Sequence, residues 1–148
     1  MNPRGKMWLK LAGGLAVLFG LIMVFFGFYF MASGMTLDYV TGDNQEEQLR
    51  LMKLISLGGM YIMVNGGFHC IAGFVAILNA GSIEMAKKCK KYSRILVGLV
   101  VADVVILAIA SRTMTTIGAV VVIIPLVIAV LYTIGAQLND RQADRKEA

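Results

Sequence analysis

Three polar side chains within long apolar stretches are the residues of this sequence best suited to chemistry. Asn65 and His69 lie in the stretch 54–79, and Asp103 is a carboxylate within the stretch 95–110. An imidazole and a carboxylate that meet away from water could relay a proton, coordinate a cation or bond two helices together. Lipid offers such groups no hydrogen bonds, so each must face protein or water. Together the three residues form a candidate intramembrane polar site.

The spacing of these residues places them at similar depths. Asn65 and His69 are four residues apart and therefore share one face of a helix. Counted from the charged inner ends of their stretches, His69 and Asp103 differ in depth by only about 3 Å, at ~1.5 Å per residue. We therefore expect His69 and Asp103 to meet between neighbouring helices. Ion conduction and helix bonding are both open interpretations of that contact, and helix bonding is preferred.

Other kinds of catalytic or metal-binding site find little support. The chain has one histidine and two cysteines, and a typical zinc site would need at least two more protein ligands beside that histidine. There is no Cys-x-x-Cys pair, nucleophile elbow or phosphate-binding glycine loop. We expect a non-enzymatic protein with no catalytic residues, no bound metal and no cofactor.

The elements that must position the polar site are membrane helices. Hydrophobic residues make up 58% of the 148-residue chain, against roughly 45–50% in soluble domains. They gather in stretches of about 11–34, 54–79, 95–110 and 117–138, separated by short polar segments. We expect an all-α membrane protein in which residues 1–148 form a single antiparallel bundle of four transmembrane helices.

The net charge of +5 is better explained by membrane topology than by nucleic-acid binding. Of the 14 Lys and Arg residues, all but Arg50, Lys53 and Arg112 precede the first stretch, join the second to the third, or follow the fourth. By the positive-inside rule, the N- and C-termini should both be cytoplasmic. We expect a multi-pass protein of the cell (plasma or inner) membrane, with no nucleic-acid partner.

Two series of glycines predict close packing between the first two helices. Seven residues are nearly two helical turns, so each series forms one narrow stripe. Close backbone contact through small residues is a main source of helix association in lipid. The series are Gly13, Gly20, Gly27 and Gly34 in the first stretch and Gly59, Gly66 and Gly73 in the second. We expect the two stripes to face each other, although glycine is also generally frequent in membrane helices.

Several local features carry expectations of their own. Pro125 should kink the fourth helix, and the kink could be a hinge or purely structural. Residues 81–94 should form a basic cytoplasmic loop in which Cys89 is accessible. Residues 139–148 are polar and charged, and we expect this tail to be frayed. Glu46 and Arg50, one turn apart, should form a weak surface pair.

The function expected from these features is that of an accessory or structural subunit of a membrane assembly. Its partners would be the lipid bilayer and either another membrane protein or further copies of itself. The alternative is an oligomeric proton- or cation-linked small transporter or channel that uses His69 and Asp103. Transporters often carry internal repeats, and the glycine stripes of the first half have no counterpart in the second. This asymmetry favours the accessory role.

Overall fold

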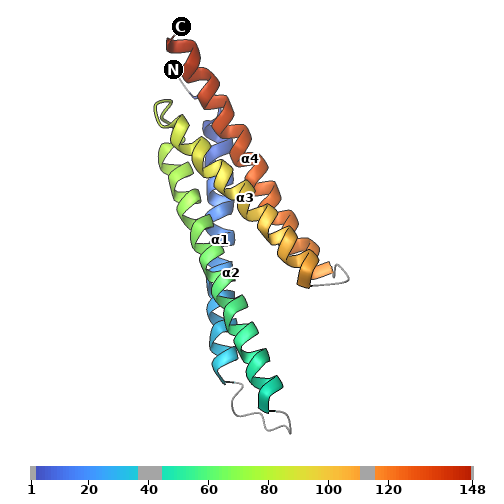
Figure 1. Cartoon of the computed structure of the whole chain (residues 1–148). Coiled ribbons are helices and arrows are strands. Elements are labelled where there is room, and N and C mark those ends of the chain that lie inside the picture. The colour runs from blue at the N-terminus through green and yellow to red at the C-terminus, as the bar shows by residue number, and fades with distance from the viewer. Residues whose placement is uncertain (1–2, 37–44, 111–115, 148) are drawn as a thin grey trace. The chain divides into compact units, whose positions relative to one another are not determined.

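A computed structural model describes residues 3–36, 45–110 and 116–147, and within them the regular structure is helical (Figure 1). The four helices are α1 (Lys6–Thr36), α2 (Gln45–Asn79), α3 (Ala86–Ala110) and α4 (Thr116–Glu147). Among the described residues, three segments are long and apolar enough to cross a membrane: Lys6–Ser33, Glu46–Asn79 and Val122–Ala143. The predicted all-helical chain of four helices is thereby confirmed.

Helix α3 is not among these three candidate spans, which were identified among the described residues alone. Its first turns carry Lys87, Lys88, Lys90, Lys91 and Arg94, so its apolar part begins only at Ile95. That part is shorter than the ~20 apolar residues that a spanning helix usually needs, and it contains Asp103. A fourth membrane crossing therefore stays a prediction.

Two of the expected segment boundaries are wrong. Because α3 begins at Ala86, most of the expected loop 81–94 is helical. The tail expected to fray from Asn139 continues α4 as far as Glu147. The side chain of Asn139 is fully buried, and that of Asp140 nearly so, which gives this polar extension tertiary contacts that a frayed tail would lack.

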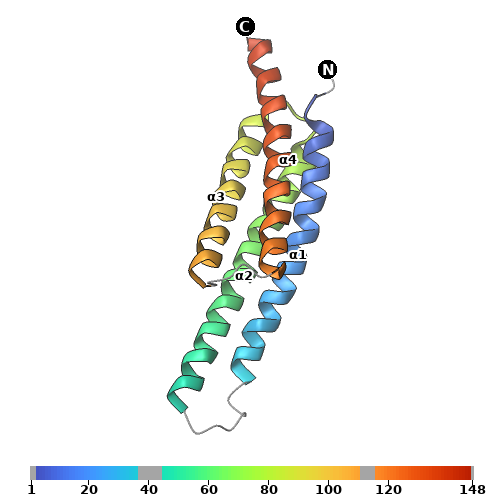
Figure 2. The ribbon, with the colours of Figure 1, turned by 90° about the vertical axis from the view of Figure 1, so that its right-hand side faces the viewer.

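The helices contribute to two compact units, Met1–Leu18 with His69–Ala148, and Phe19–Phe68. The first unit combines the start of α1, the end of α2, α3 and α4, and α3 and α4 pack side by side in antiparallel directions (Figure 2). Its core is Leu9, Ala12, Ala72, Ala76, Ala80, Cys89, Leu96, Val100, Ala129, Tyr132 and Ala136. The many alanines in this core allow the helices to approach closely. That residues 1–148 act as a single bundle stays a prediction.

The second unit is an antiparallel pair made by the end of α1 and the start of α2. A Cβ atom added at Gly66 would lie 2.7 Å from the Gly20 carbonyl oxygen, and one added at Gly59 would lie 2.7 Å from that of Gly27. Since real Cβ atoms need more room, the two backbones are close at these points. The exposed side chains of this pair include Phe25, Phe26, Phe28, Tyr29 and Phe30.

Candidate intramembrane polar site

His69 and Asp103 both belong to the first unit, where they extend the buried faces of their helices. On α2, His69 precedes the buried Ala72 and Ala76 at helical spacing, and on α3 Asp103 follows the buried Val100. His69 is 0% exposed and Asp103 is 9% exposed. The two ionisable groups thus lie on the core-facing sides of α2 and α3. Their direct contact stays a prediction.

Asn65 lies one helical turn before His69 on the same face of α2 and is 1% exposed. It belongs to the second unit, whereas His69 belongs to the first. All three residues proposed from the sequence are therefore buried side chains, and two of them lie in one compact unit.

The side-chain amide of Asn139 makes two hydrogen bonds to distant segments that were not predicted from the sequence. Its Oδ1 accepts a hydrogen bond from the Gly5 N–H at 2.7 Å, and its Nδ2 donates to the Ala80 carbonyl at 3.4 Å. One amide of α4 therefore bonds the segment before α1 and the residue that follows α2. Asn139 continues the spacing of the buried Tyr132 and Ala136 on α4; this was the signal that could have identified it.

Further polar contacts bond α4 to its neighbours in the first unit. The Lys90 ammonium contacts the Asp140 carboxylate at 2.5 Å, and the Ser93 and Thr133 hydroxyls are 2.7 Å apart. The Tyr132 hydroxyl donates to the Ala72 carbonyl at 3.1 Å. These bonds link α4 to α3 and to α2.

Cys89 is not the accessible loop residue that the sequence predicted. It is fully buried in the core of the first unit, because α3 already begins at Ala86 and turns the Cys89 side chain toward that core. Burial raises the pKa of the Cys89 thiol; Lys88 and a backbone hydrogen bond lower it by less. The thiol is therefore protonated at neutral pH and is a poor nucleophile.

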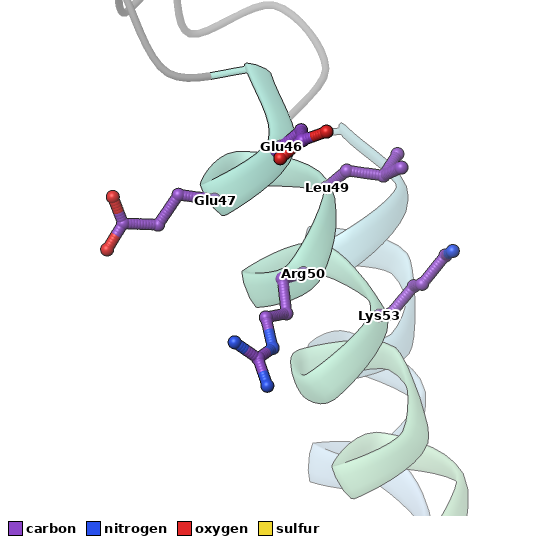
Figure 3. A pocket seen from close by; sticks show the side chains of 5 residues that line it. All are labelled: Glu46, Glu47, Leu49, Arg50 and Lys53. Atoms are coloured by element: carbon purple, nitrogen blue, oxygen red, sulfur yellow. The ribbon is translucent and has the colours of Figure 1, made fainter.

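The start of α2 carries an open surface hollow lined by Glu46, Glu47, Leu49, Arg50 and Lys53 (Figure 3). The carboxylates and the Arg50 guanidinium point in different directions (Figure 3), and these five side chains form no ion pair with one another. The expected Glu46–Arg50 pair is thus absent, in keeping with the small gain that exposed ion pairs provide.

The remaining residues proposed from the sequence are placed as follows. A Cβ added at Gly73 would lie 2.6 Å from the Gly13 carbonyl oxygen, so the backbones of α1 and α2 are also close in the first unit. The surroundings of Gly34, and all of Arg112, lie outside the described residues.

Pro125 is fully buried inside α4, which is helical before and after it. Its role as a hinge stays a prediction.

The arrangement as a whole joins helices through buried side chains that bond to carbonyls and hydroxyls of neighbouring segments. Within residues 3–36, 45–110 and 116–147, no three His, Cys, Asp or Glu side chains gather as a metal site. No family model, curated protein or solved structure matches the chain.

Proposed function

We propose that this chain is a small, non-enzymatic integral membrane protein that serves as an accessory or structural subunit of an assembly in the cell membrane. The observation that carries the proposal is the surface of the second unit. Where two helices approach through glycines, the large side chains are left on the outside. In lipid, such a surface is available both to acyl chains and to the helices of a partner protein. The glycine stripes would hold this helix pair together.

The proposed topology has four membrane crossings and cytoplasmic termini. The Arg4 N–H donates to Gln142 Oε1 at 3.0 Å, which supports placing both ends of the chain on one side of the membrane. The excess of Lys and Arg in the segments beside those ends supports the cytoplasmic side. The short apolar part of α3 would cross with local thinning of the bilayer, a modest cost for each ångström of mismatch.

The structural role is supported by the way the buried polar groups of the first unit are used. Asn139 and Tyr132 bond to backbone carbonyls of other segments. Ser93 and Thr133 bond to each other across α3 and α4. A transport pathway would instead need polar groups that remain available to a moving ion.

Purification from native membranes in mild detergent, followed by quantitative mass spectrometry, tests the accessory role. We expect a membrane protein to co-purify in stoichiometric amount. If the second unit is the docking surface, Phe28→Ala should release this partner, because the ring is 60% exposed on α1. Leu78→Ala is the control, since Leu78 is 80% exposed in the first unit. A homo-oligomer without a second protein would contradict the proposal.

The alternative, a proton- or cation-linked transporter or channel, is favoured by the burial of His69 and Asp103 in one compact unit. Intramembrane ionisable groups commonly mark ion pathways. Proteoliposomes with an imposed pH or cation gradient separate the two roles. Transport predicts a flux that His69→Gln and Asp103→Asn abolish while the protein stays folded. The structural role predicts no flux, lower stability in each single variant, and effects that do not add in the double variant.

A further inference from the structure

Two hollows follow one another along the α3–α4 pair of the first unit. The basic hollow, of about 400 Å³, is lined by Lys87, Lys90, Lys91, Arg94 and Asp140. The apolar groove, of about 360 Å³, is lined by residues that include Val97 and Val101 of α3 and Leu126, Val130, Thr133 and Ile134 of α4.

The two hollows lie on the same face of the helix pair. At 3.6 residues per turn, Lys90, Arg94, Val97 and Val101 form one narrow stripe on α3. Arg94 of the basic hollow and Val97 of the apolar groove are less than one turn apart. Asp140 and Thr133, seven residues apart, likewise share one face of α4. A ligand could therefore occupy both hollows with a charged end and an apolar end.

The basic hollow has unbalanced positive charge. Its one carboxylate, Asp140, already contacts the Lys90 ammonium at 2.5 Å. Lys87, Lys91 and Arg94 are the further cations of the lining. Phosphate oxygens suit such a set, since the planar Arg guanidinium binds them in a bidentate manner and Lys adds point charges. The basic hollow thus fits an anionic headgroup.

The apolar groove fits a hydrocarbon chain. Its one hydroxyl, on Thr133, lies 2.7 Å from Ser93 Oγ and donates to the Ala129 carbonyl at 2.6 Å, so protein groups already satisfy it. Val130 is 48% exposed and Val97 is 45% exposed. From Leu126 to Ile134 the helix rises ~12 Å, close to the depth of one leaflet of a hydrocarbon core about 30 Å thick.

We infer that the α3–α4 face is a binding site for one anionic phospholipid of the cytoplasmic leaflet. The lipid phosphate occupies the basic hollow, and one acyl chain occupies the apolar groove. Basic pockets between membrane helices on the cytoplasmic side bind such headgroups in general. The inference rests on the membrane insertion proposed above but not on the accessory role.

Quenching of a tryptophan by lipids with brominated chains tests the site directly. In a Trp8→Phe background, Val130→Trp places the only indole in the apolar groove. Val127→Trp is the matched control, because Val127 is 47% exposed on α4 and does not line the groove. Each variant is reconstituted in nanodiscs of phosphatidylcholine containing a small fraction of brominated phosphatidylglycerol or brominated phosphatidylcholine.

We expect the anionic lipid to quench the Val130→Trp variant several-fold more effectively than the zwitterionic lipid, and both lipids to quench the Val127→Trp variant equally. Lys91→Gln and Arg94→Gln should each remove most of the preference of the Val130→Trp variant, because one cation near the membrane surface contributes ~1 kcal/mol, which is roughly fivefold in binding. Lys10→Gln removes an exposed cation outside the basic hollow and should leave the preference unchanged.

Other results overturn the inference in distinguishable ways. Equal quenching of the Val130→Trp variant by both lipids, with the Val127→Trp variant quenched as well, rejects the site but not membrane insertion. No quenching of either variant rejects insertion itself. If the brominated lipids quench the Val127→Trp variant but not the Val130→Trp variant, and chains cross-link to each other, the apolar groove is covered by a second copy of this chain. Binding of soluble glycerol phosphate, without any preferential quenching of the Val130→Trp variant by the anionic lipid, assigns the basic hollow to a free phosphate. If Val130→Trp does not fold, native mass spectrometry of the unaltered chain with the two lipids must still show preferential retention of phosphatidylglycerol.

Discussion

At position 139 a single amide bonds three segments of the first unit. The Asn139 amide accepts a hydrogen bond from the Gly5 N–H and donates one to the Ala80 carbonyl. A buried backbone group that loses its hydrogen-bond partner costs about 1–3 kcal/mol of stability. We therefore expect Asn139→Ala to lower the free energy of unfolding by ~2 kcal/mol or more. Thermal unfolding in detergent, followed by circular dichroism, measures the change.

Asn79→Ala is the control for this substitution. The Asn79 amide donates only to the Val75 carbonyl within its own helix, at 2.8 Å, and is partly buried. Its loss should lower stability by less than ~1 kcal/mol. If the two substitutions lower the free energy of unfolding equally, the hydrogen bonds of Asn139 do not contribute to the association of the three segments.

His69 and Asp103 show at the same scale what burial does and does not determine. Both side chains lie on the core-facing sides of their helices, as polar groups within apolar stretches must. Burial alone is compatible with helix bonding and with ion movement. The two roles differ in the flux and in the stability of the variants.

At the scale of the helix, adjacent glycines of α2 differ sharply in their surroundings. A Cβ at Gly66 would lie 2.7 Å from the Gly20 carbonyl oxygen, whereas a Cβ at Gly67 would meet no atom within 4 Å. Gly66→Ala should therefore destabilise the protein by ~1–3 kcal/mol through overpacking. Gly67→Ala should be neutral or stabilising, because alanine is the better helix former by about 1 kcal/mol.

Thermal unfolding of the two variants in one detergent distinguishes these outcomes. The same comparison can be repeated with Gly13 against Gly14 and with Gly59 against Gly58, since Gly14 and Gly58 also have open surroundings. If Gly66→Ala is as stable as Gly67→Ala, the glycine stripes do not contribute to the packing of α1 on α2.

At the scale of the whole molecule, the membrane topology is open to chemical labelling. Glu84 and Arg50 are exposed, whereas Cys89 is fully buried. In the unaltered chain, Cys89 should resist a membrane-impermeant maleimide at neutral pH, both because it is covered and because burial raises its pKa. Its reaction should accelerate only in alkaline solution or after unfolding.

Introduced cysteines then report the two sides of the membrane in a background where Cys70 and Cys89 are replaced by serine. Glu84→Cys should be labelled only after the cells are permeabilised, and Arg50→Cys should be labelled in intact cells. Labelling of Glu84→Cys in intact cells would invert the proposed topology.

In the unaltered chain, the folded state should also lose stability as the pH rises toward the raised Cys89 pKa, because the unfolded thiol ionises at lower pH.

The sequence alone determined that the chain is helical and that three of the described helices are long and apolar enough to cross a membrane, since length and local hydropathy decide both. It also identified Asn65, His69 and Asp103, because a polar group within an apolar stretch is conspicuous without knowledge of its neighbours. The surroundings of Asn139, Asp140 and Cys89 could not be predicted in this way. Each follows or precedes an apolar stretch, where solvent exposure is the usual expectation.

Only the tertiary structure decided that these three residues are buried. The partners of Asn139 lie in segments far away in the chain, at Gly5 and Ala80. Asp140 meets Lys90 on another helix, and Cys89 enters the core because α3 starts early. Whether a polar residue at the end of a membrane helix meets water or protein depends on which distant segment packs against it, and no local pattern in the sequence records that choice.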